Sequence, residues 1–249
     1  FIDVEKARPL SGMPDMPPSR EYPLGTDTMG RQILPVVLKG TLYTFEIGLL
    51  AGSAGLLVGI ILGFVAGYLG GPVDAIIRTS ADIILTIPAL AVLVVIASSI
   101  KETLSPKTMA AVIGLLAWMW PTRTIRAQVL SMRERPYVEI ARLSGMSDLQ
   151  IIVKELLPNL LPYLAASFVG AVSAAILAAV GLAALGLGPQ SEPTLGMTIF
   201  WCTYYGAILR GIYWWWLPPI AAISYVFVGL FLVAAGLDEL ANPRLRRAH

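Results

Sequence analysis

The sequence predicts an all-α membrane protein that crosses the bilayer several times. Of its 249 residues, 56% are hydrophobic and 14% are charged, with a mean hydropathy of +0.73. Ordinary soluble domains carry roughly 25% charged residues. Five apolar stretches each approach or exceed the roughly 20 residues that a helix needs to cross a bilayer. They run over about 41–68, 74–100, 108–131, 163–185 and 217–237.

The composition also excludes several classes of protein. A net charge of +2 is too small to indicate a nucleic-acid partner. The single cysteine, Cys202, cannot form an internal disulfide, and the presence of only one histidine, His249, argues against a His/Cys metal site. The chain lacks a G-x-x-x-x-G-K-[ST] phosphate loop and the G-x-S-x-G and H-E-x-x-H hydrolase patterns. We therefore expect no enzyme activity, cofactor or metal in this chain.

Residues 1–40 are predicted to form a polar segment with an interfacial helix, outside the five-span core. Six prolines in this segment exclude a spanning helix. Within it, Tyr22 to Arg31 reads YPLGTDTMGR, a glycine-rich turn. The chain begins at Phe1 without a signal-peptide pattern, so we expect that the true N-terminus is missing.

The first predicted span carries small residues at a regular interval. Gly55, Gly59, Gly63 and Gly67 recur every four residues. Small residues at this spacing let a second helix approach closely within lipid. These four glycines are therefore predicted to form a helix-packing face.

Charged and proline residues mark the second and third predicted spans. Asp74, Arg78 and Asp82 stand at i, i+4 and i+8, which predicts a self-paired ladder on one helical face. Trp120-Pro121 interrupts the third stretch, and a proline there is expected to kink or break the helix.

Aromatic residues precede the last predicted span. The segment 199–216 is rich in tryptophan and tyrosine, which predicts an aromatic belt at a membrane boundary; docking of a partner is the alternative. Pro218 and Pro219 suit the first turn of the last span.

The loop 132–158 between the third and fourth spans is the one long polar run between two apolar segments. Its first half has apolar positions on one predicted helical face: Tyr137, Ile140, Ala141 and Leu143. Gly145 is expected to stop this helix, and Ser147 to Gln150 reads S-x-x-Q, a capping box that starts a second helix. From polarity alone, an amphipathic loop lying on the lipid surface is an equally good interpretation.

The distribution of basic residues predicts the orientation. The cations of the central loop, its approaches and the tail are Arg123, Arg126, Arg133, Arg135, Arg142, Lys154, Arg244, Arg246 and Arg247. The short loops on the other side hold only Lys101, Lys107 and Arg210. The positive-inside bias places the loop and the C-terminal tail, 238–249, in the cytoplasm, and residues 1–40 outside.

The central loop resembles the EAA loop of binding-protein-dependent ABC importer permeases. The likeness rests on Glu139, Ala141, Gly145 and the Leu-Pro-Asn run at 157–159, with Ile140 where the family usually has a second alanine. Residues 22–32 resemble the HPLGTDxxGRD signature of the dipeptide, oligopeptide and nickel subgroup, with Tyr22 in place of histidine and Gln32 in place of the final aspartate. Further likenesses at 184–190, 193–197 and 242–246 extend the resemblance over about residues 22–247.

The resemblance implies the transmembrane domain of a type I ABC importer in a prokaryotic plasma membrane. It implies that the loop is the coupling helix, with ATPase-coupling residues Tyr137, Glu139, Ala141, Arg142, Gly145, Ser147 and Asp148. The implied partners are a second homologous permease subunit, two cytoplasmic ATPase subunits that bind ATP and magnesium, an extracellular substrate-binding protein and membrane lipid. The subgroup normally has one more helix before residue 22, so truncation or processing is expected. Dipeptides, oligopeptides, nickel complexes and sugars remain open as substrates.

Two other function classes compete with the importer. A secondary transporter or channel that works alone usually buries ionisable residues at mid-membrane for its coupling ions. The centres of the predicted spans are nearly free of charge, which argues against that class. A structural membrane subunit would differ from a permease only in lacking a translocation cavity.

Overall fold

The structure is a computed structural model that describes residues 4–100 and 104–241. These residues form helices and loops, and the only β-type pairing among them is an isolated bridge between Thr26 and Gln32. The all-α class is therefore confirmed for the described part of the chain. Lys101 and the tail from residue 242 onward, with Arg244, Arg246 and Arg247, lie outside the described residues.

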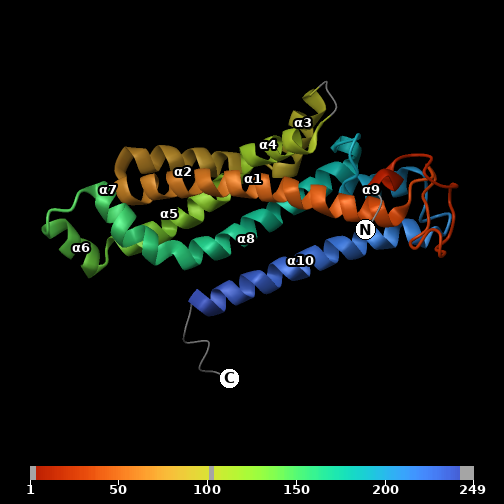
Figure 1. Cartoon of the computed structure of the whole chain (residues 1–249). Helices are drawn as coiled ribbons and strands as arrows, with labels where there is room; N and C mark the ends of the chain where they lie inside the picture. Colours follow the sequence, from red (N-terminus) through yellow and green to blue (C-terminus); the bar gives the residue numbers. More distant parts are fainter. Residues whose placement is uncertain (1–3, 101–103, 242–249) are drawn as a thin grey trace. The chain divides into compact units, whose positions relative to one another are not determined.

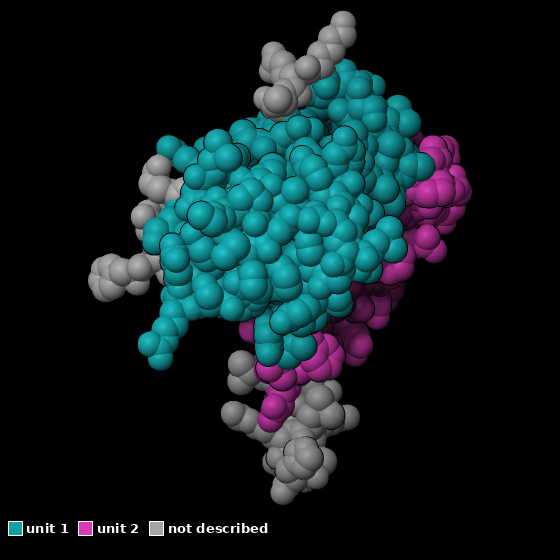
Figure 2. Space-filling model, turned by 90° about the vertical axis from the view of Figure 1, so that its right-hand side faces the viewer, with its two compact units in different colours: residues 1–50, 90–113, 173–229 teal, residues 51–89, 114–172, 230–249 magenta. Residues whose placement is uncertain are grey.

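The chain divides into two compact units (Figure 2). Unit 1 comprises residues 1–50, 90–113 and 173–229, and unit 2 comprises residues 51–89, 114–172 and 230–249. Three long helices, α1 (Ile33–Leu69), α8 (Leu157–Leu182) and α10 (Tyr213–Ala241), contribute residues to both units.

Unit 1 contains the N-terminal segment and the aromatic region. Besides its parts of the long helices, its elements are the 3-10 helix η1 (Val4–Ala7), most of α3 (Ala89–Ser99), the first part of α4 (Pro106–Ala117), the π-helical η3 (Ala183–Leu187) and α9 (Leu195–Tyr204). One of its hydrophobic clusters joins α1, α9 and α10 through Ile33, Val37, Leu195, Cys202, Ala207, Ile212 and Trp215. This cluster ties the start of α10 to the start of α1.

Unit 2 contains the central loop (Figure 1). Its own elements are α2 (Gly71–Leu85), α5 (Met119–Arg133), α6 (Pro136–Leu143), α7 (Asp148–Ile151) and the π-helical η2 (Ile152–Leu156). Its core is formed by Leu56, Phe64, Tyr68, Ile125, Val129, Val138, Ala141, Ile151, Leu156, Leu160 and Leu164. The buried side of the loop therefore belongs to the same core as α1, α5 and α8.

Three helical stretches among the described residues are long and apolar enough to span a membrane: 33–69, 148–187 and 213–237. Helices α2 and α3 are separated by a short break with a bend of 81°. They count as a fourth span only if the two helices are treated as one broken span. The third predicted span divides at Trp118, between α4 and α5, close to the break expected at Trp120-Pro121. The count of five spans stays a prediction.

Two helix starts differ from those expected. Helix α1 begins at Ile33, so residues 33–40 belong to it, and Pro35 lies in its first turn, where a missing N–H leaves no hydrogen bond unmade. Helix α10 begins at Tyr213, so Pro218 and Pro219 lie inside the helix and the expected first-turn position is wrong. Burial of Ile212 and Trp215 in the cluster of unit 1 favours this earlier start.

Candidate functional site

The candidate site is the corner formed by α6 and α7. Helix α6 begins with Pro136 at its first position, where the fixed φ of proline suits a helix start. After Leu143 the chain turns through Gly145, whose φ is +81°. A Cβ added there would meet no atom within 4 Å, so glycine is favoured by backbone conformation and not by space.

The predicted capping box is present at the start of α7. The Gln150 backbone N–H donates to Ser147 Oγ at 3.4 Å, and the Ser147 N–H donates to Gln150 Oε1 at 2.9 Å. These bonds satisfy backbone donors at the helix start that have no partner within the helix. The expected sequence of helix, glycine turn and capped second helix is therefore confirmed.

The two faces of the corner differ sharply in burial. Val138, Ala141 and Ile151 are buried in the core of unit 2. Ile140, Leu143 and Leu149 are 63%, 82% and 70% exposed. The predicted single apolar face of α6 is therefore wrong: Tyr137 and Ala141 face the core together with Val138, whereas Ile140 and Leu143 face outward. Positions 138 and 141 lie on one side of the helix, and positions 140 and 143 lie on the neighbouring side. Because both sides carry apolar residues, the sequence pattern alone could not predict which side is buried.

The polar residues predicted for coupling are mostly on the open side. Glu139, Arg142, Ser147 and Asp148 are all exposed, as is Gly145. Tyr137 is half-buried and packs against the core of unit 2. Exposed apolar side chains surrounded by exposed charges are typical of a surface that another protein covers.

Side chains from α1 and α5 hold the corner. The hydroxyl of Tyr68, near the end of α1, donates a hydrogen bond of 2.8 Å to Asp148 Oδ1. A hydrogen bond with Tyr68 raises the pKa of Arg142. Arg133, the last residue of α5, donates from Nη1 to the Tyr68 carbonyl at 3.1 Å. The sequence reasoning missed Tyr68, because nothing in the local pattern distinguishes it from other aromatic residues at a helix end.

The predicted ladder on α2 is confirmed for Arg78 and Asp82 and wrong for Asp74. Asp74 does not pair with Arg78 but with Arg126 of α5, through both the Nε and the Nη2 of the guanidinium, and both side chains are largely buried. The Asp82 carboxylate lies 3.5 Å from Nη1 of Arg123 on α5, measured from Oδ1, and 4.0 Å from Nε of Arg78, measured from Oδ2. Helix α5 packs along α2, and its arginines reach the carboxylates that the sequence pattern assigned to a neighbour on the same helix.

The four-residue glycine pattern of α1 lies against α4 and α5. A Cβ at Gly59 would lie 2.5 Å from Pro121 Cβ, at Gly63 2.9 Å from Ile125 Cβ and at Gly67 2.8 Å from Val129 Cβ, and at Gly55 it would overlap Ala117. Real Cβ atoms do not approach so closely, so larger residues would push the helices apart. The backbones of α1 and α5 are thus held together along this whole face.

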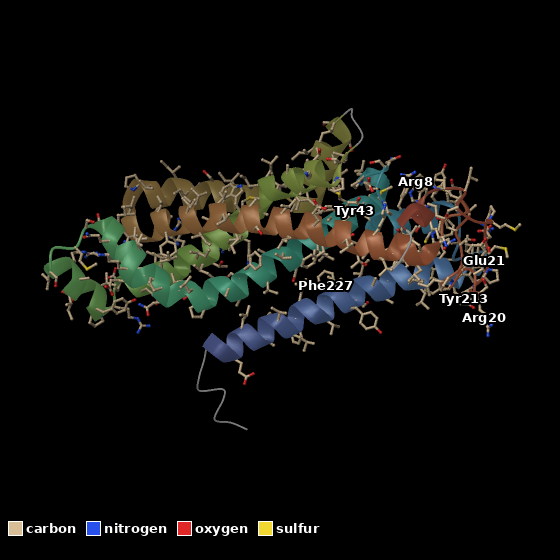
Figure 3. The ribbon with its side chains drawn as sticks, in the orientation of Figure 1. Arg8, Arg20, Glu21, Tyr43, Tyr213 and Phe227 are labelled. Carbon is tan, nitrogen blue, oxygen red and sulfur yellow. The ribbon has the colours of Figure 1, made fainter. Side chains whose placement is uncertain are left out.

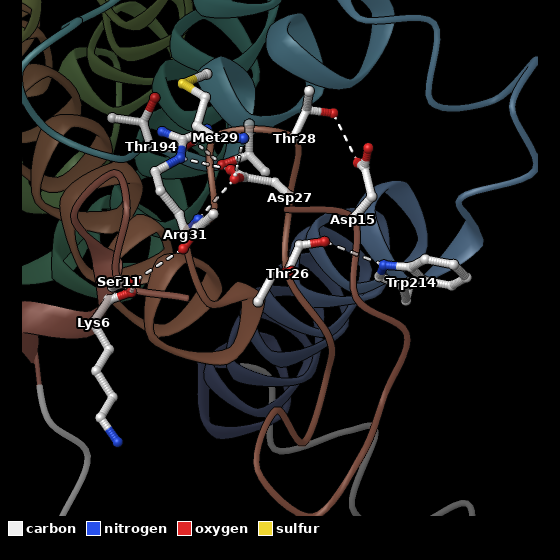
Figure 4. Close-up of polar contacts among 12 residues, drawn as sticks. Lys6, Ser11, Asp15, Thr26, Asp27, Thr28, Met29, Arg31, Thr194 and Trp214 are labelled. Atoms are coloured by element: carbon white, nitrogen blue, oxygen red, sulfur yellow. Dashed lines mark hydrogen bonds and ion pairs between the residues drawn. The ribbon is translucent and has the colours of Figure 1, made fainter. Parts of the chain in front are cut away.

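The N-terminal signature forms a closed turn (Figure 4). The Asp27 carboxylate is completely buried and accepts from the backbone N–H groups of Met29 and Arg31, both at 2.8 Å, and from Arg31 Nε at 2.6 Å. Gly25 and Gly30 have φ values of +75° and +70°. The Asp27 carboxylate therefore bonds to groups within the same turn. The charged side chains of Arg20 and Glu21 are exposed on the outside of the turn (Figure 3).

This turn is tied to the start of α10 and the loop before it. Trp214 Nε1 donates to the Thr26 carbonyl at 3.2 Å. Arg210 pairs with Asp15 and donates to Thr28 Oγ1 at 3.1 Å. The aromatic segment also packs on itself, with Tyr205 stacked between Trp201 and Trp215 at ring centroid distances of 6.0 Å. Trp215 is completely buried, so the expectation that it belongs to a membrane-boundary belt is wrong for this residue.

Residues 55–247 match the family model described as a binding-protein-dependent transport system inner membrane component. The chain is 30% identical over 233 residues to the dipeptide transport system permease protein DppC of Bacillus subtilis, covering 94% of this chain and 72% of that protein. It is 32% identical over 230 residues to the probable D,D-dipeptide transport system permease protein DdpC of Escherichia coli, covering 92% and 76%.

A solved structure shares the fold. An inward-facing conformation of the MetNI methionine ABC transporter aligns with a TM-score of 0.64 at 18% identity, over 83% of this chain and 94% of that chain. At this identity the likeness shows the fold alone. Together with the family match and the relatives, it completes the assignment: the chain belongs to the inner membrane components of binding-protein-dependent transport systems, as a non-enzymatic permease subunit of an ABC importer.

Proposed function

We propose that this permease forms half of a peptide translocation pathway and that the α6–α7 corner receives the movement of a cytoplasmic ATPase subunit. The single observation that carries the proposal is the outward face of the corner, where Ile140, Leu143 and Leu149 are exposed on a base fixed in the core of unit 2. Burying such side chains against a partner gives a favourable free energy that isolated exposure does not.

The seven coupling residues divide into two roles. Glu139, Arg142, Gly145, Ser147 and Asp148 are exposed and form the proposed contact. Tyr137 and Ala141 pack toward the core and support the contact from below. The glycines at 55, 59, 63 and 67 serve helix packing, which keeps α1 and α5 together when the corner is displaced.

The family and its relatives support our proposal for the remaining parts of the importer. The opposing wall of the pathway is a second, homologous permease subunit, and two ATPase subunits bind ATP and magnesium at the cytoplasmic face. An extracellular binding protein delivers the solute, and the names of the relatives favour peptides. The basic residues near the corner, Arg133, Arg135 and Arg142, support its cytoplasmic orientation.

Native mass spectrometry of the complex purified through this subunit tests the proposal. The wild-type chain is expected to retain two ATPase chains, a second permease and a peptide-sized ligand. Leu143→Ser is expected to lose the ATPase chains. Leu209→Ser is the matched control, because Leu209 is 93% exposed in the turn before α10 of unit 1, and it is expected to retain them.

Two results would contradict the proposal. A wild-type chain recovered alone or as a homo-oligomer would favour a transporter or channel that works by itself. Equal retention of ATPase by Leu143→Ser and Leu209→Ser would move the ATPase contact away from the corner.

A further inference from the structure

A force applied to the α6–α7 corner could bend the corner itself instead of moving the helices attached to it. Helix α6 is short, and it is linked to α7 through Gly145, which is exposed and has open space around its Cα. Helix α7 is the first turn of a helix that continues without a break through η2 and α8. A push on the exposed face of α6 can bend the chain at Gly145 unless side chains from other helices hold the corner in place.

The end of α1 supplies such a hold. Tyr68 is 5% exposed, and its ring packs in the same core as Val138, Ala141 and Ile151. Its hydroxyl reaches Asp148, the first residue of α7, at 2.8 Å. This hydrogen bond joins the end of α1 to the start of α7, two positions that are 80 residues apart in the sequence.

The last turn of α1 is itself held from a second side. Its final carbonyl groups have no partners within the helix. Arg133 Nη1 donates to the carbonyls of Gly67 at 3.4 Å and Tyr68 at 3.1 Å. Arg133 ends α5, and α6 begins three residues later. The end of α1 is therefore joined both to the entry of the corner and to its second helix.

We propose that Tyr68 is a positioning residue for coupling: its hydroxyl joins the first turn of α7 to the end of α1, so that displacement of the corner moves α1 together with the helix that continues from α7. The inference rests on the proposed function, since it needs an ATPase that moves the corner. It assigns to Tyr68 no contact with the ATPase or the solute. Helix α1 passes the movement to α5 through the close contacts of its glycines.

The test compares solute import per ATP hydrolysed in the reconstituted complete complex. Tyr68→Phe removes one hydroxyl and keeps the buried ring. Because one hydrogen bond shifts an equilibrium by about two- to twelvefold, import per ATP is expected to fall by a factor in that range. Tyr163→Phe is the control, since Tyr163 packs partly buried against the same core and its hydroxyl has no assigned role. It is expected to match the wild type.

Variants at Asp148 distinguish its hydrogen bond with Tyr68 from its proposed contact with the ATPase. Because Asp148 also belongs to the proposed ATPase contact, Asp148→Ala is expected to lose at least as much import per ATP as Tyr68→Phe. The double variant Tyr68→Phe/Asp148→Ala is expected to be no worse than the worse single variant. Unchanged import per ATP in Tyr68→Phe, or an equal loss in Tyr163→Phe, would overturn the inference, and so would additive losses in the double variant.

A second measurement does not depend on the ATPase. Amide hydrogen exchange of residues 147–157 in the purified permease is expected to quicken in Tyr68→Phe and to stay near wild type in Tyr163→Phe. Unchanged exchange in Tyr68→Phe would show that the bond does not hold α7 and would overturn the inference. A wild-type complex without ATPase subunits would instead refute the proposed function, so the two failures are distinguishable.

Discussion

The N-terminal turn around Asp27 and the α6–α7 corner use motif residues in opposite ways. In the turn, the polar side chain of the motif is completely buried and bonded to its own backbone and to Arg31. In the corner, the motif residues Glu139 and Gly145 are exposed, next to outward apolar side chains such as Leu143. A motif whose polar groups satisfy one another builds the fold, whereas a motif that leaves apolar groups exposed is available to a partner.

The glycines of the two regions show the same contrast. Gly25 and Gly30 combine a left-handed backbone with close neighbours: a Cβ at Gly25 would lie 2.6 Å from the Met16 carbonyl, and one at Gly30 would overlap the Gly12 carbonyl. Gly145 has the backbone conformation without the neighbours. The turn is therefore closed by packing, and the corner is shaped by conformation alone.

The largest expected effect is that of Asp27→Ala. Removal of this buried carboxylate leaves the Arg31 guanidinium buried without its partner, which typically costs about 3–5 kcal/mol in the free energy of unfolding. Asp15→Ala is the control, because Asp15 is more exposed and pairs with the exposed Arg210; its loss is expected to cost about 1 kcal/mol or less. Thermal unfolding of the purified complex measures both. Similar shifts for the two variants would show that the turn is not held by its buried carboxylate.

An intermediate effect is expected when the glycines are exchanged for alanine. Gly30→Ala must adopt a left-handed conformation and also displace the Gly12 carbonyl, at a cost of about 2–4 kcal/mol. Gly145→Ala meets only the conformational cost of about 1 kcal/mol. Denaturant unfolding monitored by tryptophan fluorescence compares the two. A larger loss at Gly145 would reverse the contrast between the regions.

The smallest effect on stability is expected on the outer face of the corner. Leu143→Ser changes an exposed side chain, so the free energy of unfolding is expected to stay within about 0.5 kcal/mol of wild type. Val138→Ser, one stripe away on the same helix, buries a hydroxyl in the core of unit 2 and is expected to cost about 2 kcal/mol or more. Should Leu143→Ser destabilise the protein as much as Val138→Ser, the outer face would belong to the fold and not to a partner.

Features set by neighbours in the sequence could be predicted. The capping box at Ser147, the turn at Gly145 and the break near Trp118 each depend on residues within one or two helical turns, and the structure has all three. Their signals are local because backbone hydrogen bonds and φ preferences act over a few residues.

Features set by a second helix could not be predicted. Asp74 has Arg78 at the right spacing on its own helix, yet Arg126 on α5 reaches it in a more buried position. Similarly, Val138 and Ile140 are both apolar, and only the packing of α6 on α1, α5 and α8 decides which is buried. Tyr68 gave no signal either, since its partner lies 80 residues away in the sequence.

The burial of Cys202 has a practical consequence for watching this importer work. Burial raises the pKa of this thiol to about 12, and the thiolate is the form that reacts with maleimides and spin labels. It is also the single cysteine of the chain. A cysteine introduced at the exposed position 143 or 149 would therefore be the one reactive thiol among these 249 residues. The natural sequence thus offers a ready background for placing a fluorophore on the corner and following its movement during each round of ATP hydrolysis.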